Sequence, residues 1–274
     1  MTGLVSVIIP NYNYGRFLET TIKSVLSQTA SSVDLIIVDN GSTDDSREVL
    51  DKYRGELNAI FQNNQGQASA RNTGLAHAKG SLIAFLDADD YWEPTKLERQ
   101  KELIREDAQL IYTGIRRFNS DSGSTISLIK PFFEGNCQLA FIKYPSRAIV
   151  PGGESSALLS RDFVDRVGLF NVELNSATGR DFFRRCSRFT NFRFVDEPLL
   201  NLRVHSENMS ANSKKMMDDT AKAYDFLFND DDWTFARDQR RRCLSKLQWS
   251  YMKTNLKSRE FSAAVRNFSN ILAV

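Results

Sequence analysis

The sequence predicts an α/β fold, in which a mostly parallel sheet is flanked by helices and followed by a helical C-terminal extension. Apolar runs typical of strands alternate with amphipathic stretches typical of helices over residues 4–115. This alternation is typical of βαβ units with right-handed crossovers. A cluster of polar residues follows each of the first four strand-like runs, and residues 207–274 contain helical patterns only.

The strands of the first half are expected at short apolar runs, because such runs are typical of buried strands. They lie at 4–9 (ended by Pro10), 33–38, 57–61, 82–86 and 110–115. Helices are expected where apolar residues recur at helical spacing. They lie at 17–28, at 66–78 and from Pro94 onward, and Ser42 or Thr43 is expected to cap another helix after the second strand.

The second half has a less regular pattern. It contains helical stretches near 137–143, 163–167 and 180–189, a strand-like run at 157–159, and a strand pair at 192–195 and 199–204. We therefore expect residues 1–115 and 116–206 to form two halves of one domain, with 207–274 as the extension.

Composition limits the class of protein. The chain has 274 residues, 41% of them hydrophobic, and a net charge of +2. It can bury a core, but its charge does not indicate a nucleic-acid partner. The three cysteines show no zinc or disulfide spacing, and no signal peptide or membrane-spanning stretch is recognisable. These features predict a soluble, cytoplasmic protein.

The polar clusters after the first four strands are expected to meet. They are residues 11–13, 39–42, 63–66 and 87–90. Because the carboxyl ends of parallel strands lie at one edge of a sheet, where ligands bind in such folds, the clusters predict a single pocket.

The acidic cluster Asp87-Ala88-Asp89-Asp90 is the most informative of the four. Three neighbouring carboxylates repel one another, and a divalent cation removes that repulsion. Mg²⁺ and Mn²⁺ prefer carboxylate oxygens, and Mg²⁺ is commonly held by one or two carboxylates plus substrate phosphates. The cluster therefore predicts a metal–diphosphate site, with a solvated acidic turn as the alternative.

Four stretches together resemble the family 2 nucleotide-sugar glycosyltransferases, which have the GT-A fold. They are Val5–Asn13, Ile36–Asp44, Gly66–Leu75 and Phe85–Asp90. The resemblance is dense over about the first 115 residues and thins to about residue 210. It implies that 1–115 binds the nucleotide-diphospho-sugar, with UDP as the expected nucleotide, and that 116–206 binds the acceptor. It also implies transfer to an acceptor hydroxyl with inversion, in polysaccharide or glycoconjugate synthesis.

The resemblance implies that Pro10, Tyr12, Asp39, Arg71 and Asp87 bind the nucleotide. The Tyr12 ring can stack on a base, the Asp39 carboxylate can accept a hydrogen bond, and the Arg71 guanidinium can pair with base or phosphate. Their structural alternatives are strand-edge packing for Tyr12, a turn cap for Asp39 and an ion pair with a strand-end aspartate for Arg71.

The resemblance also implies a metal held by Asp89 and His205, with Asp87 contacting ribose or the metal through water. The metal would be Mn²⁺ or Mg²⁺. Asp90 is expected to cap a loop or helix, and a structural role for His205 is the alternative. Trp92 is expected either to line the acceptor side or to be a buried anchor.

The general base has two candidates in the sequence, Asp181 and Glu154. Family members carry a Glu-Asp pair at the start of a helix after a turn like Gly168–Asn171, and here that pair is not intact. One alignment makes Asp181 the base, and another places Thr178-Gly179 at the pair and leaves none. Asp181 otherwise balances the helix dipole. Glu154 is the alternative candidate for the base. It is otherwise expected to contact the donor sugar or the acceptor, or to cap a loop.

The C-terminal extension is basic. Between Ala236 and Arg266 it has nine Lys or Arg and two acidic residues. It is expected to be a solvated helical face, a partner contact, or a peripheral contact with the inner face of a membrane that gives access to a lipid-linked rather than a free saccharide acceptor.

Two other function classes remain open from sequence. A nucleotidyltransferase would need a glycine-rich, basic phosphate loop after the first strand, which residues 11–16 lack. A non-catalytic nucleotide-sugar-binding module is favoured by the broken acidic pair near Asp181.

Overall fold

The computed structural model describes residues 3–29, 32–208 and 213–257. In this part of the chain nine strands form one sheet, with the order β3-β2-β1-β4-β8-β6-β9-β5 and β7 paired to β6. The strands are β1 (Val5–Asn11), β2 (Val33–Asp39), β3 (Asn58–Phe61), β4 (Leu82–Phe85), β5 (Tyr91–Trp92), β6 (Leu110–Asn119), β7 (Thr125–Ile129), β8 (Leu158–Ser160) and β9 (Phe192–Val204).

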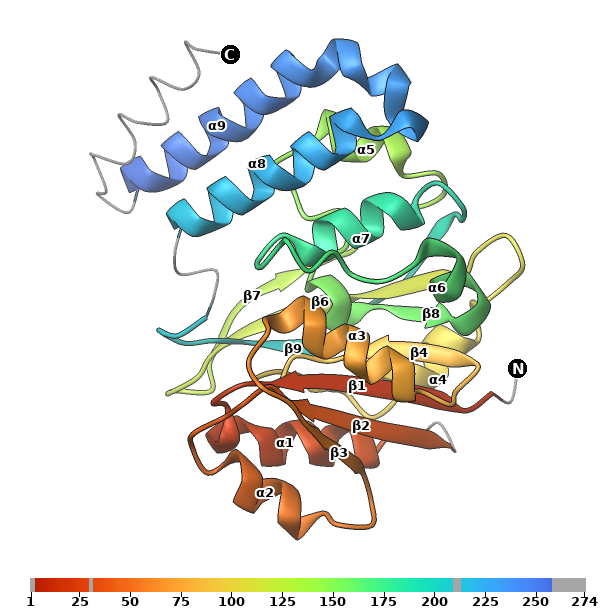
Figure 1. Cartoon of the computed structure of the whole chain (residues 1–274), viewed down its shortest axis with the longest axis vertical. Coiled ribbons are helices and arrows are strands. Elements are labelled where there is room, and N and C mark those ends of the chain that lie inside the picture. Colours follow the sequence, from red (N-terminus) through yellow and green to blue (C-terminus); the bar gives the residue numbers. More distant parts are fainter. Residues whose placement is uncertain (1–2, 30–31, 209–212, 258–274) are drawn as a thin grey trace.

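Helices cover both faces of this sheet and extend from one end of the molecule (Figure 1). They are α1 (Gly15–Leu26), α2 (Ser46–Lys52), α3 (Gln67–His77), α4 (Lys96–Lys101), α5 (Gln138–Lys143), η1 (Gly153–Ser156), α6 (Arg161–Val167), α7 (Thr178–Cys186), α8 (Ser213–Asn229), η3 (Asp231–Gln239) and α9 (Arg240–Lys257).

The first half is a parallel sheet, as predicted. β1 pairs in parallel with β2 and with β4, so that Ile8 lies between Ile36 and Phe85. Successive side chains of a strand point to opposite faces. Val7 therefore packs with α1 and α2 in one core, while Ile8 packs with α3 in the other. Strands buried on both faces explain the continuous apolar runs of the sequence.

The second half of the sheet is mixed rather than parallel. β8 is antiparallel to both β4 and β6, whereas β6 and β9 are parallel. The strand pair expected at 192–195 and 199–204 is one strand, because the register shifts at Gly114 of β6 and pairing continues through Pro198. β5 and β7 were not expected, since β5 has two residues and β7 is largely exposed.

Two expected helix starts are wrong. The helix after β2 begins at Ser46, and Ser42 instead accepts a hydrogen bond from the Asn13 backbone N–H (2.9 Å). The helix expected to open with Pro94 begins at Lys96. Pro10 also does not end the first strand, because it lies buried within β1 opposite Val38.

The C-terminal helices pack on the second half. Ile142 of α5 shares a core with Tyr224 and Leu227 of α8 and with Leu247 of α9. This helical layer lies at the end of the molecule opposite α1 and α2 (Figure 1). The rest of the expected extension, 258–274, lies outside the described residues.

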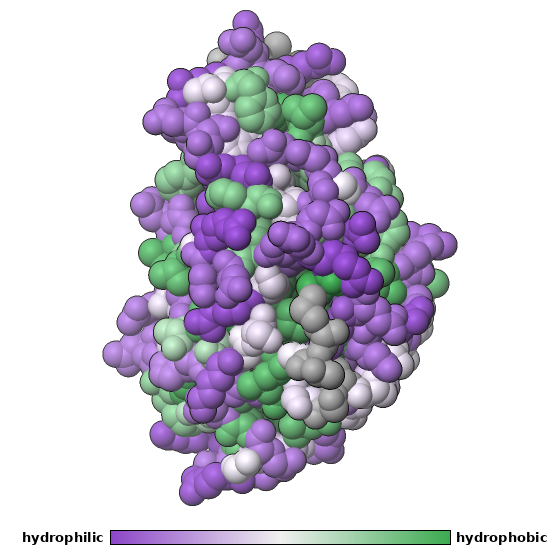
Figure 2. Space-filling view, turned by 90° about the vertical axis from the view of Figure 1, so that its right-hand side faces the viewer, coloured by the Kyte–Doolittle hydropathy of each residue, from purple (hydrophilic) through white to green (hydrophobic). Residues whose placement is uncertain are grey.

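None of the helices within 3–29, 32–208 and 213–257 combines the length and apolar character needed to cross a membrane. On the face drawn in Figure 2, hydrophobic residues reach the surface in patches separated by hydrophilic ones.

Candidate active site

The loops that leave the first four strands are joined by side-chain hydrogen bonds, which confirms that they share one edge. Asn11 Nδ2 at the end of β1 donates to Asp39 Oδ2 at the end of β2 (2.9 Å). Asn40 then connects to the loop after β3, where its Oδ1 accepts from the backbone N–H of Gln65 (3.1 Å). Gln67 of α3 donates to Asp87 Oδ1 after β4 (3.0 Å).

The Asp39 carboxylate is fixed by its own turn. Its Oδ1 accepts from the backbone N–H groups of Gly41 (3.2 Å) and Ser42 (2.9 Å), and the residue is 5% exposed. The capping role expected for Asp39 is therefore present, and the nucleoside contact stays a prediction. Tyr12 lies just beyond β1 and is 45% exposed, so its ring is available for stacking. Buried Pro10 offers no comparable surface.

Arg71 connects helix α3 to three other parts of the site, although the residue is only 2% exposed. Its Nη2 pairs with Asp87 Oδ1 (2.8 Å), and its Nη1 pairs with Glu154 Oε1 (2.8 Å) and donates to Thr178 Oγ1 (3.1 Å). The ion pair expected as its structural alternative is thus present. α3 can approach the sheet this closely because Gly74 has no side chain, and a Cβ there would collide with Ile8.

The acidic loop after β4 concentrates negative charge. Burial raises the pKa of the Asp87 carboxyl to about 6, and Asp89 and Glu154 add to the rise while Arg71 opposes it. Burial, with Asp89 and Asp87, also holds the pKa of Asp90 well above its usual range. Carboxyl groups that raise one another's pKa are stabilised in their ionised form by a nearby cation.

Asp89 and His205 lie together, as the resemblance implied. His205 Nε2 is 3.0 Å from Asp89 Oδ2, and Asn208 Nδ2 donates to the same oxygen (3.2 Å). Arg203 fixes β9 to the acidic loop, because its backbone N–H donates to Asp90 Oδ1 (2.9 Å). Asp90 therefore has a structural role.

The donor set fits a divalent cation that is completed by a substrate. Among the described residues, no group of three or more His, Cys, Asp and Glu is arranged to hold a metal. A carboxylate oxygen of Asp89 is the kind of ligand that Mn²⁺ and Mg²⁺ prefer, and the imidazole nitrogen of His205 lies beside it as a second nearby donor. Mg²⁺ usually takes its remaining ligands from waters and phosphates.

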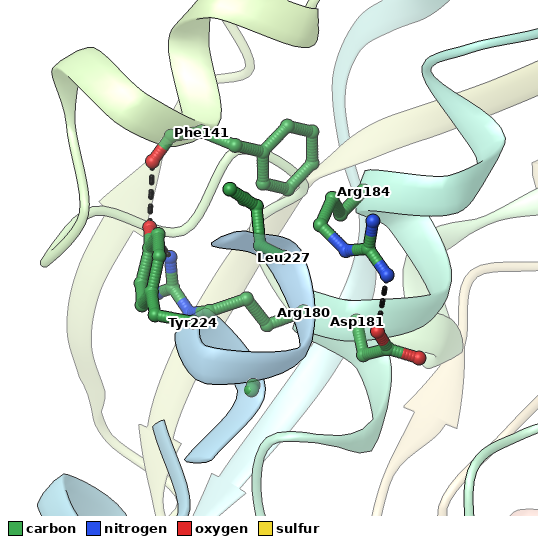
Figure 3. Close-up of a pocket in the computed structure, with 7 residues that line it drawn as sticks. Phe141, Arg180, Asp181, Arg184, Tyr224 and Leu227 are labelled. Atoms are coloured by element: carbon green, nitrogen blue, oxygen red, sulfur yellow. Dashed lines mark hydrogen bonds and ion pairs between the residues drawn. The ribbon is translucent and has the colours of Figure 1, made fainter. Parts of the chain in front are cut away.

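Asp181 pairs with arginines of its own helix rather than with these groups, and its expected role as the base stays a prediction. Its Oδ1 pairs with Arg184 Nη2 (2.9 Å) and its Oδ2 with Arg185 Nε (3.0 Å), both on its own helix. Asp181 is 3% exposed. Figure 3 shows it beside Arg184, in the interface where α7 meets α5 and α8. Its oxygens are therefore occupied within the protein.

Glu154 does lie in the site. It belongs to η1, is 8% exposed and forms the ion pair with Arg71 described above. Trp92 is 2% exposed, and its Nε1 donates to the Ser155 carbonyl oxygen (2.8 Å). Of the two roles expected for Trp92, the structure supports the buried anchor.

Sequence reasoning assigned no role in the site to Asn11, Thr178 and Asn208. Asn11 lies inside a stretch that carries the family resemblance, and Asn208 lies three residues after His205. Their positions in the sequence could therefore have indicated that they belong to the site. Thr178 contacts Arg71 across 107 positions of sequence. Only the three-dimensional fold, which brings Thr178 of α7 to Arg71 of α3, reveals that contact.

Comparison with known proteins shows where the chain belongs. An uncharacterized glycosyltransferase of Nostoc sp. (strain PCC 7120) is 50% identical over 105 residues, which are 37% of this chain and 33% of that protein. The UDP-Glc:alpha-D-GlcNAc-diphosphoundecaprenol beta-1,3-glucosyltransferase WfaP of Escherichia coli is 44% identical over 99 residues, which are 35% of this chain and 39% of that protein. The matched part spans 33% to 42% of the first three curated relatives.

The fold is also found among solved structures. S. aureus TarS 1-349 in complex with UDP-GlcNAc matches with a TM-score of 0.70 and 18% identity, over 97% of this chain and 80% of that chain. This likeness confirms the GT-A fold that the sequence resemblance implied. The model of the family described as glycosyl transferase family 2 matches residues 6–167, which is more than half of the chain. The chain therefore belongs to glycosyl transferase family 2.

Proposed function

We propose that this protein transfers a sugar from a nucleotide-diphospho-sugar, with UDP as the nucleotide, to an acceptor hydroxyl with inversion at the anomeric carbon. The observation that carries the proposal is the acidic loop after β4, where Asp89 meets His205 and Asp87 meets Arg71. Membership of glycosyl transferase family 2 supports the same reaction class.

Each group has a role that its position allows. Tyr12 stacks on the base, and Asp39 accepts a hydrogen bond from the nucleoside. Asp87 contacts the ribose, while Asp89 and His205 hold Mn²⁺ or Mg²⁺. The bound cation supplies electrostatic stabilisation of the diphosphate leaving group. The chain's own residues fix the donor against the edge of the sheet, and orientation of this kind contributes a large part of the rate.

A non-catalytic binding module is the second candidate, because Asp181 is sequestered in ion pairs. The two functions differ in turnover. A transferase with its metal releases UDP from a UDP-sugar and passes the sugar to water or to an alcohol. A binding module takes up the nucleotide and releases nothing.

UDP with Mn²⁺ is expected to raise the melting temperature of the protein, because a ligand that binds the folded state stabilises it by mass action. At 100 times its dissociation constant the gain is about 2.7 kcal/mol, and each kcal/mol shifts the melting temperature by roughly 2–4 °C for a protein of about this size. Differential scanning fluorimetry measures the shift, with GDP, CMP and dTDP as matched nucleotides and EDTA removing the metal. Equal melting temperatures with UDP and with each of these other nucleotides, at all Mn²⁺ concentrations, would contradict the proposal.

The acceptor is proposed to be lipid-linked, with the C-terminal helices resting on an anionic membrane. A cavity of about 290 Å³ lies between α5 and α9. Its charged lining residues, Lys143, Arg242 and Lys246, are all basic, and Leu139 and Ile142 provide apolar surface beside them. A basic surface with adjacent apolar side chains suits lipid phosphates at an interface.

The double substitution Arg242→Gln and Lys246→Gln is expected to weaken binding to anionic vesicles about 30-fold, since each basic residue near such a surface contributes about 1 kcal/mol. Co-sedimentation with phosphatidylglycerol vesicles measures this, and phosphatidylcholine vesicles give the neutral reference. Lys52→Gln is the control, because Lys52 is exposed on α2 at the opposite end of the molecule. Unchanged sedimentation of the double variant, or equal binding to neutral vesicles, would contradict membrane contact.

A further inference from the structure

We propose that Glu154 is the carboxylate that takes the proton from the acceptor hydroxyl, in place of an acid on helix α7. The assignment rests on the proposed transfer reaction. The Glu154 carboxylate lies beside Gly179, which is in the first turn of α7. A Cβ built on Gly179 would lie closest to Glu154 Oε2, and 2.7 Å from Glu154 Cδ and 2.9 Å from its Oε1. The Glu154 carboxylate thus fills the volume that a side chain at position 179 would occupy.

The two oxygens of Glu154 are in different surroundings. Oε1 pairs with Arg71 Nη1 (2.8 Å), and Thr178 Oγ1 lies 3.4 Å from it. No described residue forms a hydrogen bond with Oε2. It is also absent from the fully buried side-chain atoms that lack a partner, so Oε2 is not completely buried. One oxygen is therefore held in place while the other retains its lone pairs for a proton. That division suits a base that must be both oriented and available.

The position of Glu154 relative to the donor site is fixed by its neighbours. The backbone N–H of Asp87 donates to Ser155 Oγ (3.0 Å), one residue along η1 from Glu154. Arg71 also pairs with Asp87 through its second terminal nitrogen (2.8 Å). Glu154 and Asp87 therefore lie on two sides of one guanidinium group, next to the loop that is proposed to hold ribose and metal.

The backbone before Glu154 requires glycine. Gly152 has φ 72° and Gly153 has φ 56°, in the left-handed region that other residues rarely adopt. A Cβ at Gly152 would also lie 2.5 Å from the Leu200 side chain of β9. The two consecutive left-handed glycines turn the chain so that η1 contacts β4. This turn places Glu154 at the site.

The proton transfer balances without a further reactant. The acceptor O–H bond breaks as the oxygen forms a bond to the anomeric carbon, and Glu154 Oε2 takes the proton. The bond from the anomeric carbon to the diphosphate oxygen breaks, and its electron pair leaves with the nucleoside diphosphate. Arg71 stays paired with Oε1 throughout and keeps the carboxylate in position.

The first test separates a base from a residue that only holds Arg71. Glu154→Gln keeps the shape of the side chain and removes its basicity. We expect UDP release from UDP-glucose or UDP-GlcNAc, with water or an alkyl glycoside as acceptor, to fall about 10²–10⁴-fold in kcat. The melting-temperature shift caused by UDP and Mn²⁺ should stay as in the wild type. A role limited to holding Arg71 would instead weaken nucleotide binding, because Arg71 also pairs with Asp87.

The second test moves the acid to helix α7. In Glu154→Ala the space beside Gly179 opens, so the double variant Glu154→Ala with Gly179→Asp places a carboxylate there from the helix. An aspartate in the first turn also suits the helix dipole. We expect this double variant to regain at least tenfold in kcat over Glu154→Ala. The matched control, Glu154→Ala with Gly179→Asn, should regain nothing, because it restores volume without a base.

Three outcomes would overturn the assignment of Glu154. They are wild-type turnover in Glu154→Gln, equal recovery with Asp and Asn at position 179, and loss of UDP binding in parallel with kcat. Failure of the proposed function looks different, because the wild type would then bind UDP and Mn²⁺ without releasing UDP from any donor.

Discussion

Asp89→Asn is expected to lower sugar transfer by at least a thousandfold and to abolish the effect of Mn²⁺ on UDP binding. Asp89 Oδ2 lies 3.0 Å from His205 Nε2 and accepts from Asn208 (3.2 Å), so the proposed metal position depends on this oxygen. An amide removes the negative charge that a divalent cation needs. Stabilisation of a charged leaving group in such a site is worth several kcal/mol, and about 4 kcal/mol corresponds to a thousandfold in rate.

Kinetics against Mn²⁺ concentration measure the loss, with UDP melting shifts as a second measurement. Asp90→Asn is the matched control, because Asp90 accepts a hydrogen bond from the Arg203 backbone N–H (2.9 Å) and is not a proposed metal ligand. An amide at position 90 keeps an oxygen that can accept this bond, so metal dependence should change only a few-fold. If Asp89→Asn kept its Mn²⁺-dependent melting shift while Asp90→Asn lost it, the roles of the two residues would be exchanged.

The meeting of the polar clusters after β1, β2, β3 and β4 could be predicted from sequence, because each cluster directly follows a strand. A strand and its following loop are adjacent in sequence, and the parallel register carries Asn11 beside Asp39. The apolar runs predict the strands, and the order and direction of the strands in the sheet determine which loops are adjacent. Even His205 is brought to Asp89 by a strand, since β9 ends next to it.

The contacts between η1 and α7 could not be predicted in this way. Contact between Glu154 and Gly179 joins a 3-10 turn to a helix that is distant in sequence, and a glycine gives no sequence signal of what fills its space. Asp181 has sequence evidence for both a catalytic and a structural role. It is the only carboxylate in its stretch, but arginines three and four positions later on the same helix pair with it. Such i,i+3 and i,i+4 pairs are visible in the sequence, and they favour a structural role.

Asp181→Asn is expected to destabilise the protein by about 3 kcal/mol and to leave the transfer rate of the folded protein within about twofold of the wild type. Removing one partner of a buried ion pair costs about 3–5 kcal/mol, because it leaves a buried charge uncompensated. The lower figure applies because Arg184 keeps a second partner, Asp230, at 2.8 Å. At roughly 2–4 °C per kcal/mol, the melting temperature should fall on the order of 8 °C.

Thermal melts and UDP-release rates, taken below the unfolding transition of the variant, test both halves of this expectation. Asp165→Asn is the matched control, since Asp165 forms an i,i+4 pair with Arg161 on α6 and is 59% exposed. Exposed pairs contribute about 0–1 kcal/mol, so its melting temperature should hardly change. A large loss of turnover in Asp181→Asn, with an unchanged melting temperature, would support Asp181 as the base. The opposite pattern identifies Asp181 as the charge that fastens α7 to the C-terminal helices, through the arginine that it shares with Asp230.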